Sequence, residues 1–117
     1  MTSNDKAVKI PGPGKSVRGS KTGQPIMVLF DLMGRRWAMG IIWNLHGKQC
    51  TFRELQQLCP SISPTVLNTR LKELRACNLV STAVGGYCLT RQGERLYGLL
   101  EPLGKWAKPW ASQLNEL

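Results

Sequence analysis

The most restrictive feature of the sequence is a pair of helix starts separated by a short turn. Thr51 and Glu54 have the capping-box spacing, in which each side chain satisfies a free backbone amide of a first helical turn. Ser63 and Pro64 mark a second start, because Ser can cap free amides and Pro at the first helical position loses no hydrogen bond. Residues 59–62 contain Pro and Ser and are interpreted as a turn. The sequence therefore predicts a short helix, a turn and a second helix.

The second helix of this pair is expected to bury one face. Its inward stripe is Leu67, Leu71 and Leu74, which recur at helical spacing. The helix is expected to run to about Cys77, where Asn78 can end it, because Asn tolerates the left-handed conformation that often follows a helix.

A tight β-hairpin is expected directly after this helix. Residues 79–84 and 87–89 are short segments that flank Gly85 and Gly86. Glycine permits the positive φ angles of a two-residue loop, so this spacing predicts two short antiparallel strands.

Two further helices are expected before the pair, over residues 26–33 and 35–46. The first has an apolar stripe expected to face the core, made of Ile26, Leu29, Phe30 and Met33. Val28 and Leu32 form a second apolar stripe with no obvious partner inside one subunit. We therefore assign Val28 and Leu32 to a subunit interface.

The last helix is expected to begin at the cap Thr90 and to be kinked or divided by Pro102 and Pro109. Trp106 and Trp110 lie four residues apart, beyond the part of the chain needed for the core of a small domain, and Leu114 continues their stripe. Aromatic side chains in such positions are typical interface anchors. These three residues are therefore expected to complete the interface of a two-fold dimer; the alternative is that both tryptophans fold back onto the core of the monomer.

The order of these elements predicts one domain over residues 25–117. Its fold class is mainly α-helical with a small β-hairpin, a winged helix-turn-helix with terminal dimerisation helices. Residues 1–24 contain five basic residues, one acidic residue and almost no apolar material, which predicts a flexible basic arm.

The charge of the chain favours a polyanionic partner. Sixteen Lys and Arg against seven Asp and Glu give a net charge of +9, and the pI is about 9.9. The first 25 residues lack the apolar core of a secretory signal, and charges interrupt the most apolar stretch, residues 26–45. A cytoplasmic protein without a membrane partner is expected.

Catalytic and metal-binding patterns are not found in the sequence. His46 is the only histidine and is interpreted as a polar residue at a helix end. The four cysteines, Cys50, Cys59, Cys77 and Cys88, form no CxxC pair and are interpreted as reduced thiols that act as small apolar groups. No Gly-rich phosphate loop or carboxylate pair stands out. The sequence therefore predicts no catalytic residue, no metal, no cofactor and no enzyme activity.

The second helix of the pair has the side chains that read base edges in duplex DNA. Asn68 can pair bidentately with adenine and Arg70 with guanine, whereas Thr and Val can contact the thymine methyl group. The alternative is that this face is an ordinary solvated face. The candidate DNA contacts are Ser63, Thr65, Val66, Asn68, Thr69, Arg70 and Lys72 on this helix, Ser81, Thr82 and Tyr87 on the hairpin, and Arg53 and Arg91 at the starts of the neighbouring helices.

A series of short motifs resembles the HxlR-type transcriptional regulators over about residues 25–107. The motifs are residues 31–37 (DLMGRRW), 52–55 (FREL), 62–64 (ISP), Leu67 with 70–74 (RLKEL), and Leu79, Val80, Tyr87, Leu89, Thr90 and Gly93. The resemblance implies a bacterial or archaeal winged-helix homodimer in the cytoplasm, associated with the nucleoid. It also implies that the helix after residues 62–64 reads the DNA and that the terminal helices make the dimer. With two-fold symmetry, the operator would be an inverted repeat.

Two features depart from the resemblance. Many members that sense oxidants or electrophiles have a Cys just before a Pro at the start of the first helix, whereas Gln24 precedes Pro25 here. That sensing chemistry is therefore not transferred to this chain, and a small-molecule or redox effector stays open. The hairpin is also shorter than is common in the family and contains no Lys or Arg.

Two other classes of function remain as alternatives. One is a winged-helix module that binds another protein, and the other is a non-specific binder of RNA or nucleoid DNA. Comparable affinity for scrambled DNA would favour the second, and absence of a salt-dependent DNA shift would favour the first.

Overall fold

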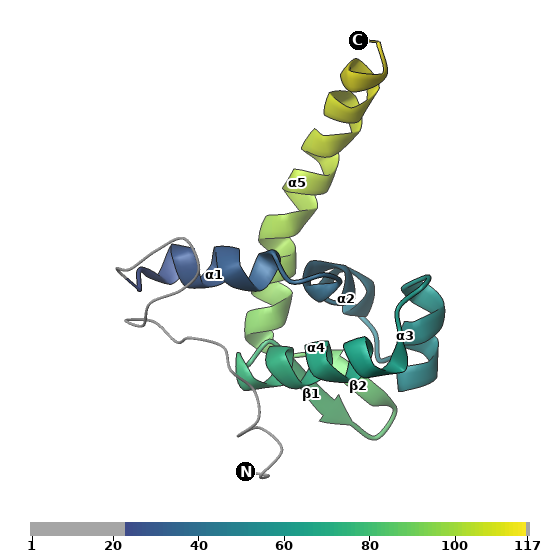
Figure 1. The fold of residues 1–117 in the computed structure, drawn as a ribbon. Helices are drawn as coiled ribbons and strands as arrows, with labels where there is room; N and C mark the ends of the chain where they lie inside the picture. The colour runs from purple at the N-terminus through teal and green to yellow at the C-terminus, as the bar shows by residue number, and fades with distance from the viewer. Residues whose placement is uncertain (1–22, 117) are drawn as a thin grey trace.

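The computed structural model describes residues 23–116, and it confirms a mostly helical chain with one antiparallel hairpin (Figure 1). The expected arm, residues 1–24, lies outside the described residues except for its last two. The elements in chain order are α1 (Pro25–Met33), α2 (Ala38–Leu45), α3 (Phe52–Leu58), α4 (Pro64–Ala76), β1 (Val80–Ala83), β2 (Gly86–Leu89) and α5 (Arg91–Asn115). This is the predicted winged helix-turn-helix order.

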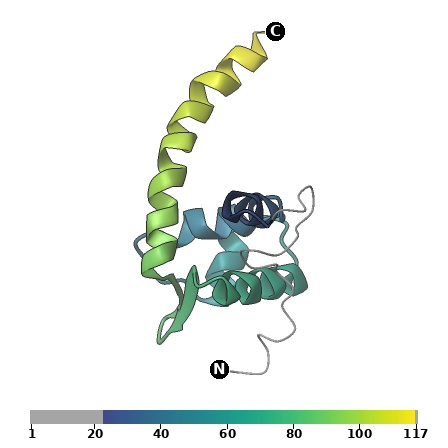
Figure 2. The ribbon, with the colours of Figure 1, turned by 90° about the vertical axis from the view of Figure 1, so that its left-hand side faces the viewer.

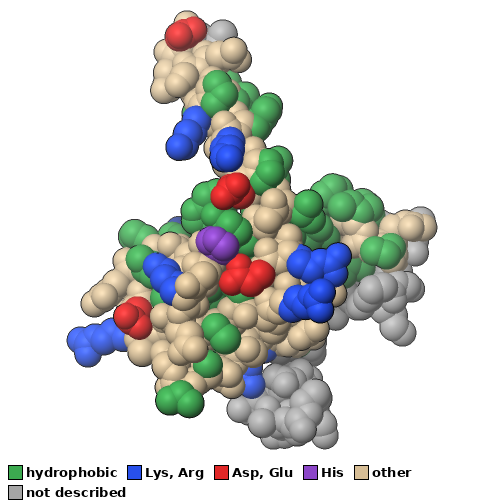
Figure 3. Space-filling view, turned by 180° about the vertical axis from the view of Figure 1, so that it is seen from behind, with side chains coloured by type: hydrophobic (Ala, Val, Ile, Leu, Met, Phe, Trp, Pro, Cys, Tyr) green, Lys and Arg blue, Asp and Glu red, His purple; other side chains and the backbone are tan. Residues whose placement is uncertain are grey.

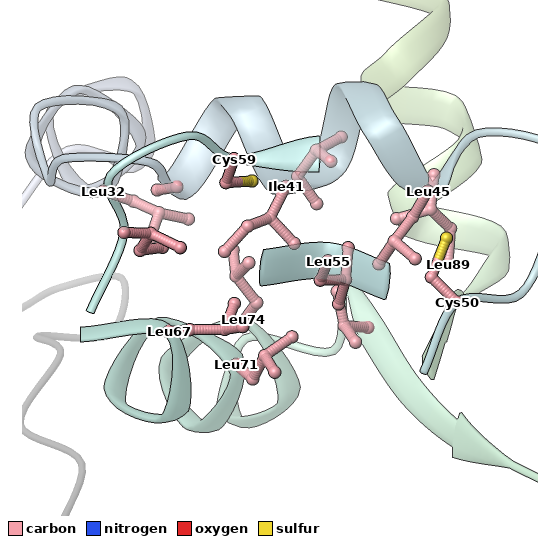
Figure 4. Close-up of a cluster of buried hydrophobic side chains, with 14 of the residues drawn as sticks. Leu32, Ile41, Leu45, Cys50, Leu55, Cys59, Leu67, Leu71, Leu74 and Leu89 are labelled. Carbon is pink, nitrogen blue, oxygen red and sulfur yellow. The ribbon is translucent and has the colours of Figure 1, made fainter. Parts of the chain in front are cut away.

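The core lies between α2, α3, α4 and the base of the hairpin (Figure 4). Among the described residues, the largest fully buried side chains are Ile41, Ile42, Leu45, Leu55, Leu67, Leu71, Leu74, Val80 and Cys59. Burying one such aliphatic side chain contributes about 1.5–3 kcal/mol. The predicted leucine stripe of α4 is confirmed, so the rotation of α4 about its own axis is fixed by packing.

The two predicted helix starts are present with their caps. The Thr51 backbone N–H donates to Glu54 Oε1 at 2.8 Å, and the Glu54 N–H donates to Thr51 Oγ1 at 3.1 Å. The Ser63 hydroxyl oxygen accepts from the Val66 N–H at 3.1 Å. Local side chains therefore determine where α3 and α4 begin.

The hairpin pairs Val80 with Leu89 at its base and Ala83 with Gly86 at its tip. Cys50 joins it on the other edge by two backbone hydrogen bonds with Tyr87, at 2.9 and 2.8 Å. Gly86 has a φ of 122°, and an added Cβ there would collide with the Cys50 carbonyl. The hairpin is therefore anchored to the chain between α2 and α3.

The terminal helices differ from the expectation in two ways. Pro102 and Pro109 do not divide α5, which is one continuous helix that bows as it projects from the domain (Figures 1 and 2). Both prolines are exposed, so water can hydrate the carbonyls that their missing N–H groups leave free. In α1, Leu32 is only 4% exposed and packs in the core, whereas Ile26 and Phe30 are each 52% exposed.

The assignment of Leu32 to a stripe without an internal partner is therefore wrong, and so is the inward assignment of Ile26 and Phe30. Only the C-terminal end of α1 lies against the core, while the rest of the helix extends sideways (Figure 1). The place where α1 meets the domain thus decides which of its faces is buried. The spacing of apolar residues within α1 does not predict that place.

Candidate nucleic-acid interface

The exposed face of α4 carries hydrogen-bonding side chains near its N-terminus. Thr65, Asn68 and Thr69 are all exposed, because the leucine stripe occupies the opposite face. An exposed Asn on such a helix can donate to and accept from adenine, and Thr can contact a thymine methyl group. Lys72, one turn further along, is half-buried.

The N-terminal end of α4 opens onto a cavity of about 110 Å³. Its lining residues are Arg36, Trp37, Ser61, Ile62, Ser63 and Val66. Ser63 accepts a hydrogen bond as the cap of α4, which leaves its hydroxyl hydrogen for another acceptor. The positive end of the helix dipole also favours an anion here.

Arg36 is a candidate contact that sequence reasoning missed. It is exposed in the loop between α1 and α2, and its guanidinium lies 5.9 Å from the centre of the Trp37 ring. The backbone of Trp37 has a φ of 72°, which turns the chain so that this loop borders the start of α4. The basic pair before Trp37 was visible in the sequence, but its distance from α4 depends on tertiary packing.

Arg70 is partly exposed and forms hydrogen bonds within the protein. Its Nη1 donates to Glu73 Oε1 at 3.1 Å, and its Nε donates to the Arg36 carbonyl at 2.7 Å. The side chain of Arg70 is 19% exposed. Glu73, a residue that is 7% exposed, therefore holds a guanidinium that the sequence predicts to be free or partly free.

The hairpin offers fewer polar groups than expected. Thr82 is exposed, whereas Ser81 is half-buried and its hydroxyl lies 3.4 Å from Cys88 Sγ. Tyr87 is half-buried and packs against the core. Arg53 is the second residue of α3 and Arg91 is the first residue of α5, and both are exposed.

The terminal helices carry a large exposed apolar surface, which Figure 3 shows along the projecting helix and around α1. Trp106 is 60% exposed, Trp110 46% and Leu114 47%. The two indole rings stack on one another with centroids 5.3 Å apart. The alternative that they fold back onto the core of the monomer is therefore wrong. Val28 is half-buried.

A polar contact joins the end of α2 to the start of α5. His46 Nδ1 lies 2.7 Å from Glu94 Oε1, and the Gly47 N–H donates to Glu94 Oε2 at 3.2 Å. The His46 ring also stacks on the Tyr97 ring, with the two ring centroids 3.7 Å apart. The hydrogen bond from His46, followed by that from Gly47, lowers the pKa of Glu94 despite slight desolvation. His46 is thus a helix-end residue that contacts α5.

Three of the four cysteines lie where thiolates are disfavoured. All four thiols are free, and Cys50 and Cys59 are buried in the core. Burial raises the pKa of Cys50, Cys59 and Cys77, which makes them poor nucleophiles. Within residues 23–116, no group of three or more His, Cys, Asp or Glu is placed to hold a metal ion.

Comparisons with known proteins agree with this geometry. A family model described as HxlR-like helix-turn-helix matches residues 32–115. The HTH-type transcriptional regulator YodB of Bacillus subtilis is 33% identical over 85 residues, covering 67% of this chain and 76% of that protein. The uncharacterized HTH-type transcriptional regulator YvaP of the same organism is 32% identical over 87 residues, covering 68% and 81%.

Two solved structures share the fold. Quinone-bound YodB from B. subtilis superposes with a TM-score of 0.67 at 33% identity, covering 72% of this chain and 96% of that one. A possible HxlR family transcriptional factor from Thermoplasma volcanium gives a TM-score of 0.66 at 28% identity, covering 72% and 82%. In the part of the chain that the structure describes, no helix is both long and apolar enough to cross a membrane.

Proposed function

The chain belongs to the HxlR-like helix-turn-helix family of transcriptional regulators, and from this we propose that it binds duplex DNA sequence-specifically as a two-fold homodimer. In this proposal α4 is the recognition helix. The observation that carries it is the orientation of α4, whose buried leucines leave Thr65, Asn68 and Thr69 in solvent next to a capped helix start. That arrangement suits entry into a major groove.

In this proposal, one set of residues contacts the bases and another set contacts the phosphates. Asn68, Thr65, Thr69 and Val66 face the bases. The phosphate contacts are Ser63, Lys72, Arg53, Arg91 and the added candidate Arg36, with Ser81, Thr82 and Tyr87 as lesser contacts from the hairpin. The net charge of +9 supplies long-range attraction, to which the basic residues of 1–24 contribute.

A second copy of the chain is the proposed occupant of the apolar surface on the terminal helices. The interface residues are Val28, Trp106, Trp110 and Leu114, to which we add Ile26 and Phe30 in place of the buried Leu32. α5 has 25 residues and is therefore about 37 Å long, so its distal half extends beyond the domain. A self-complementary contact between such helices would present two α4 helices to successive major grooves about 34–36 Å apart.

Selection of bound fragments from random duplex DNA tests the proposal. We expect enrichment of an inverted repeat, and an affinity for it at least about 10³-fold above that for a scrambled duplex at physiological salt. Equal affinity for both duplexes would instead identify a general nucleic-acid binder. No DNA binding at low salt would leave the protein-interaction module as the function.

A further inference from the structure

Four charged side chains form a partly buried network between α1 and α4. These are the side chains of Asp31, Arg35, Arg70 and Glu73. Together with the Arg36 carbonyl, we call them the Glu73 network. Each carboxylate oxygen of Glu73 accepts from a different arginine: Oε2 from Arg35 Nη1 at 2.7 Å, and Oε1 from Arg70 Nη1 at 3.1 Å. The Glu73 side chain is 9% exposed. Because Glu73 bridges two cations, displacing either one leaves a buried charge incompletely paired.

The outer ends of the network attach to the first helix and the loop after it. Arg35 Nη2 donates to Asp31 Oδ2 at 2.9 Å, and Arg70 Nε donates to the Arg36 carbonyl at 2.7 Å. Burial alone lowers the pKa of Arg35, but hydrogen bonds to Asp31 and Glu73 outweigh it and raise that pKa. Two positive and two negative charges balance, so the network ties α4 to α1 without a net buried charge.

The contacts of Arg70 use the shape of its side chain. Its Nε and Nη1 groups point at two acceptors on different segments, the loop before α2 and Glu73 on its own helix. A lysine has a single terminal nitrogen and does not reproduce this fork. We propose that Arg70 is a positioning residue, which holds α4 at its angle to α1 for DNA reading and does not itself contact a base. This inference rests on the proposed function.

The network also connects two surfaces that the proposed function uses separately. Asp31 lies on α1, whose exposed residues Ile26 and Phe30 belong to the proposed dimer interface. Arg70 lies on α4, the proposed recognition helix. Arg35 and Glu73 thus join the helix that carries part of the proposed interface to the proposed recognition helix.

Arg70→Gln, Arg70→Lys and Asp31→Asn test the inference, with Arg75→Gln as a matched control on α4 outside the network. Affinity for the duplex enriched by the wild type, and for its single-base variants, is measured by fluorescence anisotropy at several salt concentrations. Circular dichroism confirms that each variant is folded. We expect Arg70→Gln to weaken binding about 2- to 30-fold on every duplex, the range typical of residues that act through a coupling network. The salt dependence should stay unchanged.

The companion variants separate positioning from charge. Arg70→Lys should bind as weakly as Arg70→Gln, because it keeps the charge and loses the fork. Asp31→Asn should also weaken binding, and its combination with Arg70→Gln should cost less than the product of the two effects. Arg75→Gln should bind close to the wild type.

Other results would overturn the inference. Loss of preference at one base position of each half-site in Arg70→Gln would show that Arg70 reads a base. A salt slope reduced by about 1.8, which is two contacts per dimer, and restored by Arg70→Lys, would show a phosphate contact. Unchanged affinity in folded Arg70→Gln and Asp31→Asn would show that the network only stabilises the fold. If the wild type enriches no duplex at all, the proposed function fails first and the inference falls with it.

Discussion

The most informative perturbation of the proposed dimer is Trp106→Ser on the projecting part of α5. Trp106 is 60% exposed in the isolated chain and stacks only on the similarly exposed Trp110 among its ring contacts in the described residues. A buried indole covers about 150–250 Å², so roughly 100 Å² or more of this ring is available to a partner subunit. At about 25 cal/mol per Å², covering that area contributes about 2.5 kcal/mol per ring.

The symmetry of the dimer doubles this effect. Each dimer contains two copies of Trp106, so full coverage corresponds to about 5 kcal/mol, or more than three orders of magnitude in the dissociation constant of the dimer. Light scattering and sedimentation over a dilution series give that constant directly. Val84→Ser is the control, because Val84 is fully exposed at the tip of the hairpin and away from the terminal helices.

Two outcomes are expected for the variant. Trp106→Ser should dissociate at concentrations where the wild type is dimeric, and it should remain helical because the ring lies outside the buried core. A wild type that is already monomeric at micromolar concentration would refute the assignment of this surface to a second copy. A dissociation constant unchanged by the substitution would refute the role of Trp106.

Three further predictions concern the start of α4, the α2–α5 contact and the N-terminal residues. Arg36→Gln should weaken binding to all duplexes and lower the slope of log K against log salt by about 1.8, since each of the two subunits loses one phosphate contact; an unchanged slope in a binding titration would exclude that contact. Glu94→Gln should lower the free energy of unfolding at neutral pH, because a carboxyl group with a lowered pKa stabilises the fold only while it is ionised. The difference in free energy between wild type and variant should therefore shrink as the pH falls below 4.5, the ordinary pKa of a glutamate. A pH-independent difference in chemical denaturation would contradict this expectation. Deleting residues 1–24, which carry a net charge of 5 − 1 = +4, should weaken DNA binding more at low salt than at high salt, whereas identical slopes would assign these residues no part in binding.

The features that the sequence predicted correctly are those set by residues close together in the chain. The caps at Thr51 and Ser63 join side chains to amides three residues away. The leucine spacing within α4 also determines which face of the helix is buried. Thr65, Asn68 and Thr69 therefore lie on the exposed face. Local interactions of this kind leave a direct pattern in the sequence.

The features that the sequence did not predict depend on residues far apart in the chain. Arg35 and Glu73 are 38 positions apart, and no local sequence pattern indicates that Glu73 accepts hydrogen bonds from two arginines. The same applies to Arg36, whose place beside α4 follows from the packing of the loop before α2. The buried face of α1 and the continuity of α5 through two prolines are likewise decided by which segments lie against the core and which lie in water.

Reading of an inverted repeat by two copies of α4 should be recorded in the base-preference profile of Asn68→Ala. Every base pair of the enriched duplex is changed in turn, and the affinity of wild type and variant is measured for each. Asn68 is exposed, so its removal should leave the fold unchanged. We expect the variant to lose preference, worth about 1–3 kcal/mol per contact, at two positions related by the two-fold symmetry of the duplex. An unchanged profile, or loss at a single position, would contradict it.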